Sequence, residues 1–244
     1  MQAKLLALLC VMSLVSVINS VPYDYYVFAS IWAGTNCYMQ PCYENQTASL
    51  NPTFVNIHGL WPNYFNGYPQ YCDNTSSYNP NNIPSLLLNK METNWNGMNW
   101  TTYDFHDHEW TKHGTCWNDP AGDQVSDSRK QLDYFTTVMS IALRQDIYGA
   151  LKRGGVVPRS EPYDLDSFTN AMNRAFGNGT YLLECETDDS NNQYIFSFYI
   201  CLDLKYQLMT CPDNLGDHFN DLCPPGLIYY PPVGTSNQTY VFDV

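Results

Sequence analysis

Residues 105–116 read FHDHEWTKHGTC and place three of the chain's five histidines within eight positions. We expect a short helix over residues 104–114, ended by Gly114. At about 100° per residue, four ionisable side chains fall within one arc of about 140°, while Trp110 faces the other side and can pack into a core. The four are His108, Glu109, Lys112 and His113. This segment alone is compatible with a catalytic surface and with an ordinary solvated face.

A metal-binding interpretation of the same segment is weaker. The zinc-protease pattern H-E-x-x-H needs its second histidine four positions after the first. Lys112 occupies that position relative to His108, and a cation there repels a metal ion. His106 and His108 form an H-x-H pair, which is a weak signal by itself, so we expect no metal site.

A second segment, HGLWP at residues 58–62, carries another histidine. We expect a short strand over Thr53–Ile57 that ends at His58, followed by a turn shaped by the glycine and proline of the motif. Residues 63–82 are rich in Asn, Pro, Tyr and Gly and indicate a long loop. Because a histidine at the end of a strand is common in protein cores, this segment is also ambiguous alone.

The composition excludes several classes of protein. The 244 residues include 11 Lys and Arg against 24 Asp and Glu, a formal net charge of −13. Charged residues are only 14% and hydrophobic residues 44%, which excludes a disordered acidic tail and a coiled coil. An acidic chain does not bind nucleic acid through a broad basic patch. Any activity on nucleic acid therefore has to come from a local site.

The first twenty residues are typical of a signal peptide. Lys4 precedes an apolar run over residues 5–18, and Asn19 and Ser20 follow it. The run is short for a membrane span, although an uncleaved anchor is the alternative. We expect residues 21–244 to form a single domain in the secretory pathway, outside the cell or in a lysosomal or vacuolar lumen.

Cysteine usage agrees with export. Eight cysteines follow the signal segment, and an even number in an exported chain predicts four disulfides, although eight cysteines allow 105 pairings. Five N-x-[ST] sequons are candidate N-glycan sites on surface loops. Their asparagines are Asn45, Asn74, Asn99, Asn178 and Asn237.

The order of predicted elements favours an α+β fold, since helices gather in the middle of the chain and strands at both ends. The further strands expected are Tyr23–Trp32, Tyr181–Glu186, Tyr194–Leu204 and Tyr206–Thr210. The further helices expected are 84–95, Lys130–Lys152 and Asp164–Phe176, the last with Asp164 or Asp166 as N-cap and Gly177 after its end. No internal repeat and no Gly/Ser linker divides the chain.

Together, HGLWP and HEWTKHGTC (108–116) resemble the two active-site segments of the ribonuclease T2 family, the secreted transferase-type acid ribonucleases. YDYYVFASIW, YDLDSFTNAM and YIFSFYICLDL are similar to other parts of that family, so the resemblance extends over residues 23–223. It does not cover the tail LIYYPPVGTSNQTYVFDV.

The resemblance implies a central antiparallel sheet with packed helices, stabilised by disulfides. It implies the pairs Cys37–Cys42, Cys72–Cys116, Cys185–Cys223 and Cys201–Cys211. It also implies a monomeric endoribonuclease that cleaves single-stranded RNA by 2′-OH transesterification, with a 2′,3′-cyclic phosphate and then a 3′-phosphate as products. From the resemblance we also expect that no metal, cofactor or membrane takes part, and that DNA is not cleaved because it lacks the 2′-OH.

The family resemblance assigns roles to five residues. His113 is the expected general base and His58 the expected general acid. Lys112 is expected to neutralise the phosphorane, Glu109 to polarise the site and help keep a histidine protonated, and His108 to contact phosphate. With histidine pKa values near 6.5 and a sequence pI of about 4.5, we expect activity to be highest at mildly acidic pH.

Base recognition is less defined by the sequence. Trp61 is expected either to stack on a base or to pack in the core, and Asn63 is expected to contact a base. Plant members carry two glutamines where this chain has Ser30 and Ile31, so no base preference follows from that position.

The alternative function is a catalytically silent binding or signalling protein on the same scaffold. Such a protein is expected to lose a catalytic histidine. His58, Glu109, Lys112 and His113 are all present, which favours an enzyme.

Overall fold

The computed structural model describes residues 23–117, 125–212 and 222–235, so the predicted signal peptide lies outside the described residues. The elements are β1 (Tyr25–Ile31), α1 (Ala33–Met39), α2 (Glu44–Thr47), β2 (Asn56–Asn63), α3 (Ser85–Asn94), α4 (Thr102–Lys112), α5 (Asp127–Gln145), α6 (Ile147–Arg153), β3 (Arg159–Asp164), α7 (Leu165–Phe176), β4 (Tyr181–Thr187), β5 (Gln193–Leu202) and β6 (Leu227–Tyr230). Two short 3-10 helices lie at Pro80–Asn82 and Gly114–Cys116.

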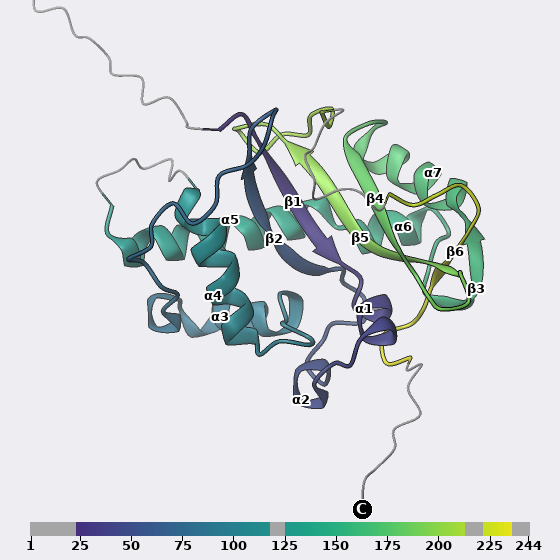
Figure 1. The fold of residues 1–244 in the computed structure, drawn as a ribbon, viewed down its shortest axis with the longest axis horizontal. Helices are drawn as coiled ribbons and strands as arrows, with labels where there is room; N and C mark the ends of the chain where they lie inside the picture. The colour runs from purple at the N-terminus through teal and green to yellow at the C-terminus, as the bar shows by residue number, and fades with distance from the viewer. Residues whose placement is uncertain (1–22, 118–124, 213–221, 236–244) are drawn as a thin grey trace, which may run out of the picture.

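A six-stranded sheet joins these elements. Its order is β2-β1-β5-β6-β3, and β4 pairs with β5 outside this path. The pairs are antiparallel except β5–β6, which is parallel. The sheet crosses the molecule diagonally, with α5 behind it and α3 and α4 beside β2 (Figure 1). The predicted α+β class and central, mainly antiparallel sheet are therefore confirmed.

The core lies where α5 and α4 meet the sheet. All seven residues of β1 are buried, because neither face of this inner strand is open to solvent. Buried residues of α5 recur at helical spacing, including Tyr134, Phe135, Val138 and Ala142. Four fully buried tryptophans fill much of this core. They are Trp32, Trp95, Trp110 and Trp117.

The strand predictions need three corrections. The strand expected over Thr53–Ile57 is β2, which begins at Asn56 and continues through the whole HGLWP motif, so no turn follows His58. Tyr206–Thr210 is not a strand, and only an isolated bridge joins Leu208 to Leu202. The prediction missed β3 and β6, and β6 lies in the tail that the resemblance did not cover.

The helix predictions need one main correction. The helix expected over Lys130–Lys152 is two helices, α5 and α6, separated at Asp146. Asp146 has φ 28°, and its carboxylate accepts a hydrogen bond from the Gly149 amide, so it caps the second helix. The other expected helices are confirmed within a few residues. Asp164 is the N-cap residue of α7, although its side chain makes no capping hydrogen bond.

All four disulfide pairings that the resemblance implies are confirmed. They join Cys37 to Cys42, Cys72 to Cys116, Cys185 to Cys223 and Cys201 to Cys211. Among the described residues, no helix has the length and apolar character needed to cross a membrane.

Candidate active site

A β-bulge in β2 positions the first histidine. In the pairing with β1, Gly59 lies opposite Ala29 and Ile57 opposite Ser30, so His58 is an extra residue without a partner. Two residues three positions apart normally lie on opposite faces of a strand. The bulge instead lets Ile57 and Leu60 both enter the core, each fully buried, while His58 and Trp61 both line a cleft on the other face.

Gly59 lets α4 approach this strand closely. A Cβ atom at this position would lie 2.0 Å from Glu109 Oε2 and 2.7 Å from Trp61 Nε1. The glycine of HGLWP is therefore required by the approach of a carboxylate to the strand.

Helix α4 delivers the second group of ionisable residues. Thr101 caps its N-terminus by accepting a hydrogen bond from the Asp104 amide. Trp110 is fully buried, as the helical arc predicts, and anchors the helix in the core. His108 and Lys112 line the cleft, and His113 lines it immediately after the last helical residue.

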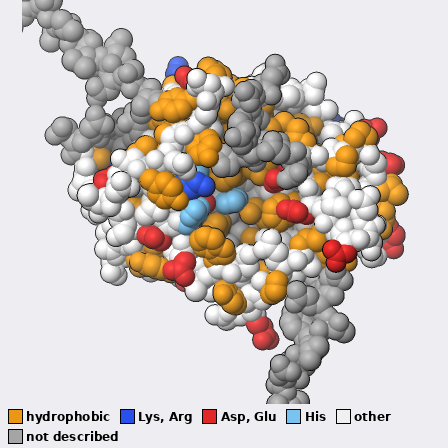
Figure 2. All heavy atoms as spheres, in the orientation of Figure 1, with side chains coloured by type: hydrophobic (Ala, Val, Ile, Leu, Met, Phe, Trp, Pro, Cys, Tyr) orange, Lys and Arg blue, Asp and Glu red, His pale blue; other side chains and the backbone are white. Residues whose placement is uncertain are grey.

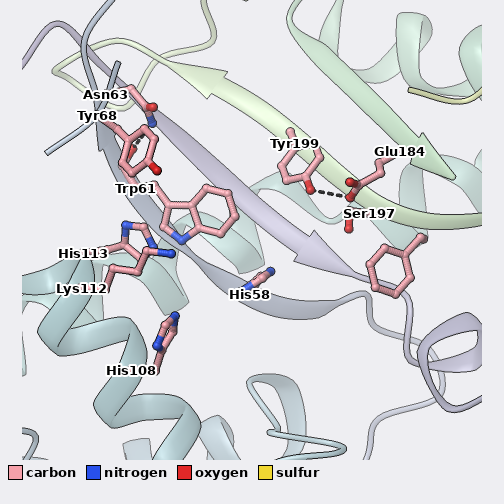
Figure 3. A pocket seen from close by; sticks show the side chains of 11 residues that line it. His58, Trp61, Asn63, Tyr68, His108, Lys112, His113, Glu184, Ser197 and Tyr199 are labelled. Carbon is pink, nitrogen blue, oxygen red and sulfur yellow. Dashed lines mark hydrogen bonds between the residues drawn. The ribbon is translucent and has the colours of Figure 1, made fainter. Parts of the chain in front are cut away.

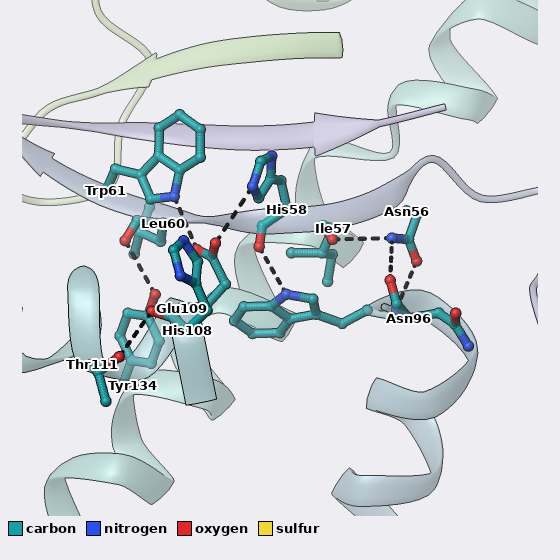
Figure 4. Close-up of polar contacts among 11 residues, drawn as sticks. Asn56, Ile57, His58, Leu60, Trp61, Asn96, His108, Glu109, Thr111 and Tyr134 are labelled. Carbon is teal, nitrogen blue, oxygen red and sulfur yellow. Dashed lines mark hydrogen bonds and ion pairs between the residues drawn. The ribbon is translucent and has the colours of Figure 1, made fainter. Parts of the chain in front are cut away.

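Glu109 connects the two segments beneath the cleft. Its side chain is fully buried, and its Oε2 accepts a hydrogen bond of 3.0 Å from Trp61 Nε1. Its Oε1 lies 3.4 Å from Nε2 of His58, whose backbone carbonyl accepts a 2.8 Å hydrogen bond from Trp95 Nε1 (Figure 4). His58 is therefore held at two points, at its backbone carbonyl by Trp95 and at one ring nitrogen by Glu109.

Burial sets the protonation of this pair. It raises the pKa of Glu109 to about 8, partly opposed by the Trp61 hydrogen bond and by Lys112. It lowers the pKa of His58 to about 3, with His108 and Lys112 lowering it further. About a quarter of the His58 side chain is exposed at the cleft, where hydration partly opposes this lowering. Both directions place the pair's one proton on the carboxyl group in mildly acidic water.

His58 and His113 stand on either side of one indole. The ring centroid of Trp61 lies 4.9 Å from that of His58 and 5.1 Å from that of His113, and it stacks on the latter. The His108 ring lies edge-on to His113 at 6.5 Å (Figure 3). Two imidazoles from separate segments therefore share one cleft.

The cleft has a volume of about 260 Å³ and contains six of the seven predicted site residues. They are His58, Trp61, Asn63, His108, Lys112 and His113, while Glu109 lies beneath them. Asn63 is held by a 3.0 Å hydrogen bond from its side-chain amide to the Trp61 carbonyl. Figure 2 shows the pale blue histidines beside a blue cationic side chain in a hollow on the viewed face.

Four further lining residues were missed by sequence reasoning: Glu184, Phe196, Ser197 and Tyr199. The sequence did carry a signal for three of them. Ser197 and Tyr199 lie two positions apart in an apolar strand and therefore share one face, and Glu184 is a carboxylate within the strand YLLECET. Of the loop aromatics, Tyr68 lines the cleft.

His106 belongs to the core. It is buried, its Nε2 lies 2.7 Å from the Trp95 carbonyl, and burial lowers its pKa to about 4. Across the part of the chain that the structure describes, no three His, Cys, Asp or Glu side chains are grouped so that they could hold a metal ion. His218 lies outside the described residues.

The Cys72–Cys116 disulfide joins the loop after β2 to the end of the α4 segment. Two hydrogen bonds reinforce this connection, from the Tyr71 amide to the Lys112 carbonyl and from the Cys72 amide to Thr115 Oγ1. The loop is thus fixed to the backbone next to His113.

Comparisons with known proteins agree with this arrangement. The sequence profile of the ribonuclease T2 family matches residues 23–211. The chain is 33% identical over 223 residues to Ribonuclease 1 of Arabidopsis thaliana, covering 85% of this chain and 92% of that protein. It is 33% identical over 214 residues to Extracellular ribonuclease LE of Solanum lycopersicum, covering 85% and 89%.

A solved structure gives the same result for the fold. The crystal structure of RNase NT in complex with 5′-AMP matches with a TM-score of 0.71 at 29% identity, covering 86% of this chain and 98% of that one. A profile match over most of the chain, relatives of similar length and a shared fold lead to one conclusion: the chain belongs to the ribonuclease T2 family.

Proposed function

We propose that this chain is a metal-independent endoribonuclease that cleaves single-stranded RNA by attack of the ribose 2′-OH on the adjacent phosphorus. The observation that supports it most is the pair His58 and His113, which come from separate segments and flank Trp61 in one cleft with Lys112. This set supplies a base, an acid and a cation around one phosphodiester.

In the first step, His113 takes the proton of the 2′-OH while the 2′-oxygen bonds to phosphorus. The bond from phosphorus to the 5′-oxygen breaks, and that oxygen receives a proton through His58. The products are a 2′,3′-cyclic phosphate and a free 5′-OH. In the second step, water replaces the departed alcohol, the two histidines exchange roles, and a 3′-phosphate forms. DNA is not cleaved because it lacks the nucleophile.

The remaining residues adjust charge and position. Lys112 meets the negative charge that develops on the phosphorane oxygens, and His108 contacts a phosphate oxygen. Glu109, beside His58 and carrying a raised pKa, is the reservoir for the proton that His58 delivers. No cofactor is needed for this chemistry.

Trp61 and Asn63 are proposed to contact the substrate. The indole N–H of Trp61 is engaged by Glu109 and its ring stacks on His113, so its first role is to hold the catalytic rings apart. The side-chain amide of Asn63 donates to the Trp61 carbonyl, which directs its carbonyl oxygen toward a base donor.

We propose that the protein acts as a monomer in the secretory pathway, outside the cell or in an acidic lumen. Four disulfides and the apolar run after Lys4 support this location. Exposed sequon asparagines support N-glycosylation at Asn45, Asn74 and Asn178. Asn99 is partly buried and donates to Gln40, so its glycosylation requires that contact to open. Asn237 lies outside the described residues.

An RNA digestion at pH 5 in EDTA tests the proposal. The wild type is expected to cleave, with cyclic phosphate appearing before 3′-phosphate. His58→Ala and His113→Ala are each expected to lose about 10³-fold or more. His218→Ala is the matched control and is expected to retain activity. A folded wild type that binds RNA without cleaving it would instead indicate a silent binding protein, and cleavage lost in EDTA would indicate a metal enzyme.

A further inference from the structure

The cleft continues beyond His58 to polar groups that the cleavage chemistry does not use. Glu184 comes from β4, and Ser197 and Tyr199 come from β5. All three line the same cleft as the histidines. Figure 3 shows them on the side of His58 away from His113 and Lys112.

These groups form a connected network. Glu184 and Ser197 are cross-strand partners, and Tyr199 donates a 2.5 Å hydrogen bond to Glu184 Oε2. Ser197, which is 1% exposed, lies beside them as the cross-strand partner of Glu184. The carboxylate is therefore fixed by one oxygen while Glu184 itself remains partly exposed to the cleft.

A fixed carboxylate beside a phosphate site needs an explanation, because it repels a polyanion. It is favourable there only if it accepts hydrogen bonds from the substrate. In RNA, paired N–H donors are found on the bases, so the network is suited to a base edge.

The chemistry of the base edges selects one base. Guanine presents two adjacent donors, N1–H and the 2-amino group, which match the two oxygens of a carboxylate. Adenine and cytosine present one amino group beside an acceptor nitrogen, and uracil presents one N–H between two carbonyl oxygens. Each of the latter three turns an acceptor toward the second carboxylate oxygen.

The position along the RNA follows from the proposed function, on which this inference rests. His113 acts on the nucleotide that carries the 2′-OH, and His58 acts on the departing 5′-oxygen. A base beyond His58 belongs to the nucleotide that keeps this oxygen, which lies on the 3′ side of the scissile bond. We propose that Glu184, held by Tyr199, recognises guanine at that position and is the residue that determines specificity there.

Dinucleotides provide the test. The wild type is expected to cleave UpG roughly tenfold to a hundredfold more efficiently than UpI, in which inosine lacks the 2-amino group. Glu184→Gln replaces one acceptor oxygen by a donor and is expected to remove this difference. Glu186→Gln removes the same charge two residues along β4, outside the cleft lining, and is expected to keep the preference.

A binding measurement separates this inference from the proposed cleavage. The 2′-deoxy dinucleotides dUpdG and dUpdI cannot be cleaved, and the wild type is expected to bind the first about tenfold more tightly, with no difference for Glu184→Gln. Equal binding and equal cleavage of the guanine and inosine substrates by the wild type would overturn the inference, even if RNA cleavage itself is established. A preference that persists in Glu184→Gln would overturn it too.

Discussion

The least usual residue of the site is Glu109, a carboxylate with no exposed surface. Its Oε2 is satisfied by Trp61, whereas Oε1 faces His58 at 3.4 Å and has no closer polar partner among the described residues. An ionised carboxylate is costly in such a place unless it is fully paired. The position therefore favours the protonated acid, and that makes Glu109 a store of one proton next to His58, the proposed general acid.

The raised pKa of Glu109 predicts how stability depends on pH. The pKa of Glu109 is about 4.5 in the unfolded chain and about 8 in the folded protein. Its contribution to the free energy of unfolding is therefore fully present below about pH 4.5 and is lost as the pH rises through 8. Relative to Glu109→Gln, the free energy of unfolding of the wild type is expected to fall between these limits, by up to about 1.4 kcal/mol per pH unit. Urea denaturation of both proteins at pH 5, 6, 7 and 8 measures this difference.

His58 is present in both proteins, and its contribution to stability changes with pH in the opposite direction. Its lowered pKa stabilises the fold above about pH 6.5 and that stabilisation is lost toward pH 3, so the comparison isolates Glu109. A difference that stays constant from pH 5 to 8 would mean that folding does not raise the pKa of Glu109.

At the scale of the element, β2 shows which features could be predicted from the sequence and which could not. His58, His113, Lys112 and Glu109 could be predicted as site candidates because their motifs are specific, and the core side of α4 followed from helical spacing at Trp110. The strand character of HGLWP was missed because glycine and proline usually mark turns. Only the bulge at His58, a tertiary feature of the pairing with β1, reconciles this motif with a strand.

The other differences between the predicted and the observed elements also arise from features that local sequence does not show. Strand β6 is only four residues long, which is too short for the alternation of polar and apolar residues to predict a strand. It is defined instead by its pairing, which is parallel to β5 at two positions. The break at Asp146 depends on one residue with positive φ, which the apolar periodicity of the segment conceals. The cleft residues Glu184 and Tyr199 are brought to the histidines by sheet pairing, over distances that local sequence does not encode.

The close approach of α4 to β2 predicts a strong effect of Gly59→Ala. The added methyl group meets the Glu109 carboxylate and the Trp61 indole, and both must shift. Such overpacking destabilises by about 1–3 kcal/mol, and a shift of about 1 Å at a catalytic group costs on the order of 10²-fold in rate. Thermal denaturation and RNA digestion measure the two effects. Gly155→Ala, where a Cβ meets nothing within 4 Å but φ is +83°, is the control for backbone strain without contact with the site.

The Cys72–Cys116 disulfide predicts a separable effect on activity. Its 44-residue separation corresponds to about 4 kcal/mol of stabilisation in the loop-entropy estimate, against about 2 kcal/mol for the five-residue separation of Cys37–Cys42. Replacing Cys72 and Cys116 by serine is expected to lower stability more and also to lower kcat, because the loop is attached next to His113. The Cys37/Cys42 double serine variant is expected to keep kcat, and an equal loss of kcat in both would contradict a positioning role.

At the scale of the whole molecule, a net charge of −13 surrounds a cleft that has to accept a phosphate. The global field repels a long RNA, whereas Lys112 attracts the one phosphate that enters. The two fields differ in range, since salt screens distant charges within about 10 Å at 0.1 M. Lowering the pH from 7 to 5 weakens the repulsion, because exposed carboxylates begin to protonate. This is a physical reason to expect the highest activity in mild acid.

This balance predicts an unusual response to salt. For most nucleic-acid-binding proteins, added salt weakens binding because the protein is basic. Here, at pH 7, raising NaCl from 20 to 200 mM is expected to increase kcat/KM for a long single-stranded RNA relative to that for UpU, which carries a single phosphate and samples mainly the local site. At pH 5 the ratio is expected to change less. Parallel measurements on both substrates give this ratio directly, and a ratio that falls with salt at pH 7 would mean that an attractive surface outside the cleft outweighs the acidic charge.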